Sequence, residues 1–200
     1  MAITTEIIKE LREKTGVGIM DCKNALKECE GDIEKAIEYL RKKGIATAQK
    51  RGGRATSMGQ VQAYIHAGGK IGVLVEVNCE TDFTGKTEDF TQFTKDLAMQ
   101  IAATNPISID REGVPERVLA VEKEIYFTQA RESGKPEKVL EKIVEGKLNK
   151  FFADACLLEQ PFVKNSDITV QDLLNGLIAK TGENIVVRRF ARFQLGEKDE

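Results

Sequence analysis

The chain of 200 residues contains one histidine, four cysteines, four prolines and no tryptophan. Because His66 is the single histidine, any serine or cysteine relay would have to run through it, and a metal site built on two histidines is excluded. The cysteines form no Cys-x-x-Cys pair and are too few and too scattered for a disulfide framework. The sequence therefore argues against a histidine-based hydrolase, a structural zinc site and a disulfide-stabilised fold. The cysteines are Cys22, Cys29, Cys79 and Cys156.

Long apolar runs and an excess of basic charge are also missing. No run of about 18 apolar residues is present to span a membrane, and the first residues lack the basic and apolar regions of a secretory signal. The formal net charge is -2, so the chain lacks the basic surface with which nucleic-acid-binding proteins displace counterions from phosphates. We expect a cytoplasmic protein with no membrane contact and no direct nucleic-acid contact.

Residues 1–54 are predicted to form a small three-helix module followed by a basic linker that starts near Ala46. Apolar residues recur at helical spacing, and polar caps and glycines mark the helix ends. The basic residues of the linker either contact RNA or are simply solvated, and we favour the second interpretation. The predicted helices run from a cap at Thr4 or Thr5 to Gly16, from about Met20 to Cys29, and from the cap Asp32 to Gly44.

The connection between the first two helices is unusually apolar for a turn. Val17, Ile19 and Met20 stand among glycines at positions where a solvated turn is normally polar. Either these residues form a surface for a partner, or Ile19 and Met20 fold back into the small core. The residues alone leave both interpretations open.

Residues 55–200 are predicted to form an α+β core with an antiparallel sheet. A strand at 59–66, a turn at Gly68-Gly69 and a strand at 71–77 indicate a hairpin. A helix from near Thr87 to just before Pro106 carries one apolar stripe and should cover a face of the sheet. A last strand at 184–195 should bury one face through Ile185, Val187 and, after a shift of phase, Phe190 and Phe193.

Two charged helices, about 114–132 and 136–153, are predicted to form a projecting antiparallel hairpin at about 113–154. A capping-box pattern at 169–172 indicates one more short helix after it. The hairpin's narrow apolar stripes are expected at Val118, Val121 and Ile125 on the first helix and at Val139, Ile143 and Leu148 on the second.

The strand that begins at Ile71 runs directly into Thr81-Asp82-Phe83. An acid beside a large aromatic at the end of a strand has the shape of a probe, although composition alone favours Phe83 as a core aromatic that packs under the Phe90 helix. Gly85-Lys86-Thr87 imitates the end of a phosphate-binding loop, but the glycine that such a loop needs five positions earlier is Glu80, which would repel phosphates. We therefore expect no stable nucleotide site in this chain.

Two segments resemble the signature segments of the bacterial translation elongation factor Ts family. They are Leu11-Arg-Glu-Lys-Thr-Gly-Val-Gly-Ile-Met-Asp-Cys-Lys-Asn-Ala-Leu26 and Glu76-Val-Asn-Cys-Glu-Thr-Asp-Phe83. The resemblance continues through Gly134-Lys-Pro, Leu158-Glu-Gln-Pro-Phe-Val163 and Gly182-Glu-Asn-Ile-Val-Val-Arg-Arg189, and so covers nearly the whole chain in order.

The resemblance implies a guanine nucleotide exchange factor, without covalent catalysis, cofactor or metal of its own, that binds elongation factor Tu and promotes GDP release. It also implies that the N-terminal module is of the ubiquitin-associated type, although that fold does not imply ubiquitin binding. The family assigns disturbance of the partner's magnesium to the segment Thr81, Asp82, Phe83 and Thr84. Further partner contacts are implied for His66, otherwise a plain hairpin-end residue, and for Val17, Gly18, Ile19 and Met20.

Some members of the family carry two copies of the core lobe, whereas this chain carries the strand and tip segment once. The resemblance therefore implies a homodimer in a two-plus-two complex, with 185–193 as a candidate edge strand for pairing. The chain departs from the usual family pattern at Thr84-Gly85-Lys86-Thr87, where we expect a more flexible tip. Two rival functions are an adaptor that uses only the N-terminal helices and an RNA-binding accessory protein.

Overall fold

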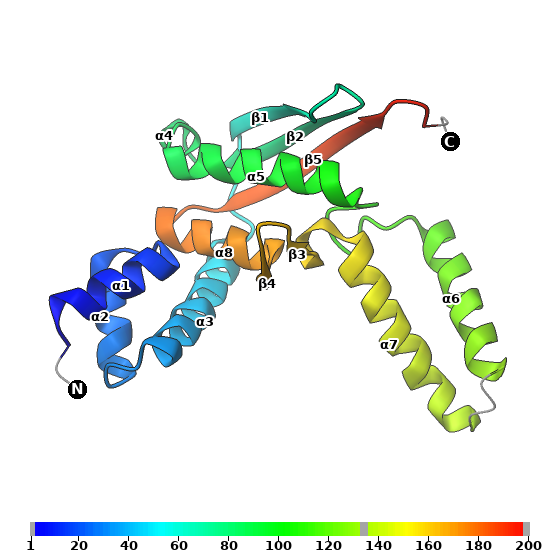
Figure 1. Cartoon of the computed structure of the whole chain (residues 1–200), viewed down its shortest axis with the longest axis horizontal. Coiled ribbons are helices and arrows are strands. Elements are labelled where there is room, and N and C mark those ends of the chain that lie inside the picture. Colours follow the sequence, from blue (N-terminus) through cyan, green and yellow to red (C-terminus); the bar gives the residue numbers. More distant parts are fainter. Residues whose placement is uncertain (1–2, 133–135, 198–200) are drawn as a thin grey trace. The chain divides into compact units, whose positions relative to one another are not determined.

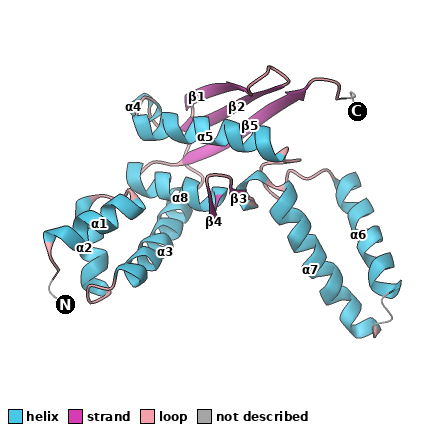
Figure 2. Cartoon of the chain, viewed as in Figure 1, coloured by secondary structure: helices cyan, strands magenta, loops and turns pink. Residues whose placement is uncertain are grey.

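The structure is a computed structural model that describes residues 3–132 and 136–197 (Figure 1). It confirms the predicted α+β class, with N-terminal helices followed by a sheet with packed helices (Figure 2). The chain divides into two compact units, one formed by Met1–Ala98 and Gln171–Glu200 and the other by Met99–Val170. The domain division expected at residues 54 and 55 remains a prediction. No helix in the described residues is both long and apolar enough to cross a membrane.

The first three helices are α1 (Thr5–Thr15), α2 (Ile19–Glu28) and α3 (Ile33–Arg51). The predicted caps are confirmed, since the Thr4 hydroxyl accepts the N–H of Ile7 and the Asp32 carboxylate accepts the N–H of Lys35. Such caps satisfy backbone donors that a helix start leaves free. The three helices share a core of Leu11, Cys22, Ala25, Leu26, Ala36 and Leu40.

Helix α3 continues past Gly44, where the sequence predicted its end, so residues 46–51 are helical and not part of the linker. Gly44 is buried, and a Cβ there would lie 3.6 Å from the carbonyl oxygen of Asn175 in α8 (Val170–Thr181). The Arg41 guanidinium also binds the Asp172 carboxylate of α8 at 2.6 and 3.0 Å. Gly44 therefore permits a close helix contact, and this contact outweighs its low helix propensity.

Strands β1 (Met58–Ile65), β2 (Ile71–Cys79) and β5 (Ile185–Gln194) form an antiparallel sheet in the order β1-β2-β5. The predicted hairpin is thereby confirmed. The alternate residues Val73, Val75 and Val77 of β2 are buried. Helix α5 (Glu88–Thr104) runs along one face of the sheet (Figure 1). The expected stripe on α5 is buried at Phe90, Phe93, Leu97 and Ile101.

The predicted shift of phase in the last strand is confirmed as a bulge, because the pairing of β5 with β2 slips between Val187 and Arg189. The prediction that Phe193 is buried is wrong, since its side chain is 69% exposed. Side chains alternate between the two faces with a period of two, so Phe190 and Phe193 point to opposite faces. Phe190, partly buried, keeps the packed face.

The second unit contains the two helices of the predicted hairpin, α6 (Glu116–Glu132) and α7 (Glu137–Ala155). The predicted connection at 133–135 lies outside the described residues. The short helix η1 (Leu157–Glu159) and the two-stranded sheet of β3 (Pro161–Phe162) and β4 (Asn165–Thr169) follow. The sequence did not predict this sheet, because such short strands show no hydrophobic period.

The apolar stripe of the hairpin is confirmed at Ile143 and Leu148 and differs from the prediction at three other positions. Val121, Ile125 and Val139 are exposed, and the first buried residue among the described side chains of α7 is Leu140. The observed stripe places four apolar residues at helical spacing, one more than the predicted stripe on α7. They are Leu140, Ile143, Val144 and Leu148. The hairpin core consists of Ala130, Leu140 and Val144, with Tyr126, Ile143 and Leu148 packed against them.

Candidate functional site

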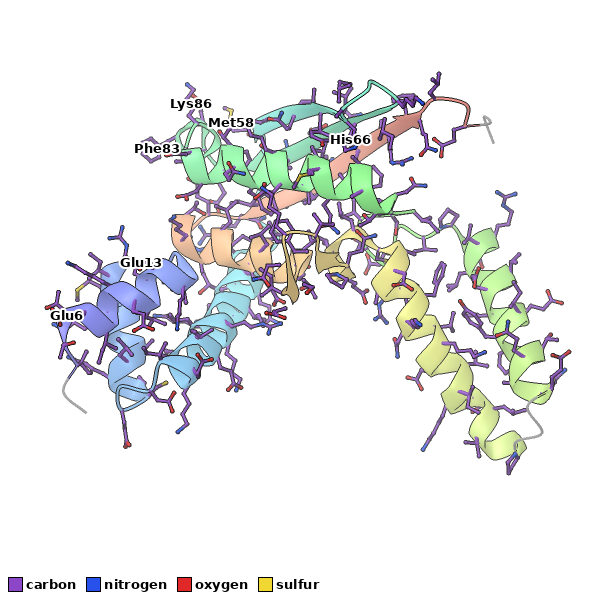
Figure 3. All side chains as sticks on the ribbon, in the orientation of Figure 1. Glu6, Glu13, Met58, His66, Phe83 and Lys86 are labelled. Atoms are coloured by element: carbon purple, nitrogen blue, oxygen red, sulfur yellow. The ribbon has the colours of Figure 1, made fainter. Side chains whose placement is uncertain are left out.

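The Thr-Asp-Phe segment forms the first turn of a short helix, α4 (Asp82–Gly85), directly after β2. Thr81 caps this turn, since its hydroxyl accepts the N–H of Thr84 at 3.3 Å. Phe83 is 82% exposed and projects from the turn (Figure 3). The alternative that placed Phe83 in the core is therefore wrong, whereas Phe90 is fully buried. We call residues 81–85 the tip.

A carboxylate from the far end of the chain holds the first residue of the tip. Glu183 accepts the N–H of Thr81 at 3.0 Å and the Thr81 hydroxyl at 2.6 Å. Burial opposes ionisation of Glu183, but the hydrogen bonds from Thr81, Thr84 and the backbone of Glu80 and Thr81 outweigh it and lower its pKa. The charged form is thus the one that these donors stabilise.

The residue before the tip is held by the same distant segment. The Glu80 carboxylate accepts the N–H of Asn184 at 2.6 Å and lies 3.4 Å from the Arg54 guanidinium. The Asn184 side chain in turn donates to the carbonyl of Arg54 at 2.9 Å. Glu80 was considered in the sequence only as an obstacle to a phosphate loop, whereas the structure gives it a supporting role.

The inner side of the tip packs against the start of β1. Thr84 is 3% exposed and Gly85 is buried. A Cβ at Gly85 would lie 3.5 Å from the Cα of Gly59, and the side chain of Gln60 donates to the carbonyl of Gly85 at 2.6 Å. Gly59 has a φ of +136°, and a Cβ there would lie only 2.1 Å from the carbonyl oxygen of Val77. Glycine is therefore required beneath the tip.

The outer side of the tip carries charge as well as an aromatic ring. Asp82 forms an ion pair with Lys86, and the two side chains are 64% and 74% exposed. An ion pair so open to solvent contributes little to stability. Asp82 and Lys86 are therefore available to exchange this contact for one with another molecule.

The apolar loop at 17–20 divides between the two interpretations of its sequence. Val17 packs against the helical core, while Ile19 and Met20, at the start of α2, are 52% and 65% exposed. The interpretation in which Ile19 and Met20 fold back into the core is therefore wrong. Gly18 is the N-cap of α2, and as a glycine it has no side chain to accept a backbone N–H of the first turn.

His66 is exposed at the end of the β1–β2 hairpin. Its backbone N–H donates to the carbonyl of Ile71 at 2.9 Å, and its ring nitrogen Nδ1 lies 3.0 Å from the Tyr64 hydroxyl. This contact orients the ring and leaves its other nitrogen for a further partner. In the described part of the chain, no group of three or more His, Cys, Asp or Glu residues is arranged to hold a metal ion.

An exposed aromatic on a firmly held tip, together with a second exposed apolar pair, is typical of a protein that docks on another protein. A family model described as "Elongation factor TS" matches residues 27–197. The chain is 61% identical to elongation factor Ts of Desulfotalea psychrophila over 98% of this chain and 100% of that protein. It is also 64% identical to elongation factor Ts of Moorella thermoacetica over 95% of this chain and 94% of that protein. The chain therefore belongs to the elongation factor Ts family.

Sequence reasoning missed the residues that hold the tip. Glu183, Asn184 and Gly59 were given no role, although Glu183 and Asn184 lie in one of the segments that carry the family resemblance. The hydrogen bonds of Glu183 to Thr81 and of Asn184 to Glu80 join residues about 100 positions apart in the chain. Local periodicity holds no signal for such a pairing.

Proposed function

We propose that the protein is a guanine nucleotide exchange factor that binds elongation factor Tu with GDP, promotes GDP release and so allows GTP to bind during translation elongation. The observation that carries this proposal is the exposed Phe83 on a held tip in a chain of the elongation factor Ts family. The protein performs no covalent step, and it acts by binding alone.

The proposed mechanism is a disturbance of the partner's magnesium and phosphate site. GTPases hold the phosphates in a backbone cradle and use Mg²⁺ to bridge phosphate oxygens to protein ligands. Phe83 acts as an apolar wedge beside that site, and Asp82 acts on the groups that orient the ion. Thr81 and Thr84 belong to the same site in different roles, because Thr81 caps the turn and Thr84 is buried and supports it from inside.

The remaining partner contacts supply affinity. We assign them to the loop Val17, Gly18, Ile19 and Met20 and to His66. Exposed apolar residues such as Ile19 and Met20 gain roughly 25 cal/mol for each Å² of apolar surface that a partner covers. Val17 supports this surface from beneath, because it packs against the helical core just before α2 begins.

Exchange follows from linkage between the two ligands of elongation factor Tu. Any factor by which this protein weakens GDP binding is also the factor by which GDP weakens binding of this protein. A coupling of about 1–3 kcal/mol corresponds to roughly 5- to 150-fold. The protein therefore dissociates once nucleotide has rebound, and it acts repeatedly.

We further propose a homodimer in a two-plus-two complex in the cytoplasm. Strand β5 is an edge strand of the sheet, and the sheet face opposite α5 exposes Val61, Ile65, Leu74 and Phe193. A twofold axis places such a patch against its own copy. Light scattering at micromolar concentration should give twice the chain mass, and a monomer mass would contradict the dimer.

Release of fluorescent GDP from elongation factor Tu tests the exchange activity. The chain should accelerate release, and replacing Asp82 and Phe83 together by alanine should abolish the acceleration while most of the partner affinity remains. An adaptor of the ubiquitin-associated type would leave release unchanged in the parent protein. An RNA-binding protein would instead show RNA affinity that falls steeply with salt.

A further inference from the structure

The carboxylate of Glu183 is connected to the acting residues of the tip by a short chain of hydrogen bonds. Its Oε2 accepts the backbone N–H of Thr81, and its Oε1 accepts the Thr81 hydroxyl. The same hydroxyl accepts the N–H of Thr84. The connection thus runs from Glu183 through Thr81 into the turn that carries Asp82 and Phe83.

The backbone on either side of Glu183 is held as well. The N–H of Glu183 donates to the hydroxyl of Thr181, the last residue of α8, at 3.3 Å. Gly182 forms the turn between them with a φ of +71°. The next N–H, that of Asn184, donates to Glu80 at 2.6 Å. Glu183 therefore stands on a fixed base between α8 and β5 and is not a mobile surface acid.

We propose that Glu183 is a positioning residue for exchange, because its carboxylate holds Thr81 so that Asp82 and Phe83 meet the partner in one orientation. The inference rests on the proposed exchange function and extends it to a residue that touches neither nucleotide nor magnesium. Holding a group in its productive geometry raises the rate of the step it promotes. Contacts that supply affinity elsewhere on the protein are unaffected.

The test uses Glu183→Gln, which keeps the size of the side chain but removes its charge and one of its two acceptor oxygens. The maximum rate of GDP release at saturating protein should fall roughly 10-fold, in line with the loss of one charged hydrogen bond. The concentration that gives half of the maximum rate should change less than about 2-fold. The exposed Glu112 provides a matched control, and Glu112→Gln should release GDP at the parent rate.

A second variant removes the other side of the same contact. Thr81→Val keeps the shape of Thr81 and deletes its hydroxyl, and it should also lower the maximum rate. The double variant Thr81→Val with Glu183→Gln should lose less than the product of the two single losses, because the two changes break one shared interaction. Fully multiplicative losses would overturn the proposal.

Hydrogen–deuterium exchange of residues 79–85 gives a readout that is independent of elongation factor Tu. The amide of Thr81 should exchange faster in Glu183→Gln than in the parent protein, since the glutamine keeps only one acceptor oxygen for the two donors of Thr81. Parent-like amide exchange, or a parent-like rate of GDP release, in this variant would overturn the inference. An equal fall in maximum rate and affinity, with a lower melting temperature, would also overturn it by showing a general structural role.

The same experiments separate this inference from the proposed function. If the parent chain does not accelerate GDP release at all, the exchange function fails, and amide exchange still decides whether Glu183 holds the tip. If the parent chain accelerates release and Glu183→Gln does so equally well, only the positioning role fails.

Discussion

The tip and the loop at residues 17–20 both expose apolar side chains, but the protein holds them in different ways. The tip depends on residues far away in the chain, with Glu183 and Asn184 on one side and Gly59 beneath it. The loop depends on neighbours, because the Thr15 hydroxyl and the Cys22 thiol hold the backbone of Val17. Under the proposed function, the locally held loop supplies affinity and the firmly held tip acts on the nucleotide site of the partner.

The comparison is tested most severely at Gly59. Gly59→Ala places a Cβ against the carbonyl of Val77 at a φ that only glycine adopts easily, so the free energy of unfolding should fall by about 3 kcal/mol or more. The melting temperature, followed by circular dichroism, should fall by roughly 6–12 °C.

Gly176→Ala is the matched control, since it lies within α8 and a Cβ there meets nothing within 4 Å. It should leave stability unchanged or raise it by up to about 1 kcal/mol. If Gly59→Ala were as stable as this control, the tip would not depend on its distant support.

The second test separates action from affinity at the tip. Phe83→Ala should lower the maximum rate of GDP release roughly 100-fold, about 2.7 kcal/mol, without changing the melting temperature, because Phe83 is 82% exposed. Stopped-flow release over a range of protein concentrations measures both the maximum rate and the half-saturation point. A shift of the half-saturation point alone would give the tip the role assigned to the loop.

The third test applies the same assay to the loop. Replacing Ile19 and Met20 together by alanine should raise the half-saturation concentration roughly 10-fold, equivalent to about 1.4 kcal/mol of lost apolar burial. The maximum rate should stay at the parent value, because the tip is intact. A fall in the maximum rate would show that the loop also acts on the nucleotide site.

The smallest expected effect is that of pH on the hydrogen bonds between Glu183 and Thr81. The pKa of Glu183 is lowered in the folded protein, so its contribution to stability is complete above the unfolded value of about 4.3 and is lost as the pH falls through the lower folded value. The Thr81 amide resonance should therefore shift as the pH falls below the unfolded value. The carboxylates of Glu80 and Asp82 and the cations Arg54 and Lys86 also face this region. If the pH-dependent shift of the Thr81 resonance is absent in Glu183→Gln, the shift belongs to Glu183.

Several elements were predictable because a short stretch of chain determines them. The caps at Thr4 and Asp32, the turn at Gly68-Gly69 and the apolar stripe of α5 all lie where their patterns indicated. Each depends on backbone groups or side chains within a few residues. The resemblance to the elongation factor Ts family was likewise carried by continuous segments, and the comparisons confirm it.

The errors share a different cause. The end of α3 was placed at Gly44 because glycine is a poor helix former, yet Gly44 is where α8 packs closely. The stripe on α7 was correct at Ile143 and Leu148 but was begun at Val139, whereas the residues that join Ala130 of α6 in the core are Leu140 and Val144. In each case packing against a second helix decided between two helix ends or two registers that the local pattern left nearly equal.

The sequence by itself determined the fold class, most helix and strand positions, the family and the candidate residues Asp82 and Phe83, because periodicity, caps and continuous signature segments are properties of neighbouring residues. Only the tertiary structure decided that Phe83 is exposed, that Thr84 is buried and that Glu183 holds the tip. The physical reason is that exposure and long-range hydrogen bonds depend on which distant segments come together. Chain folding brings residues about 100 positions apart into contact, and no local pattern encodes that contact.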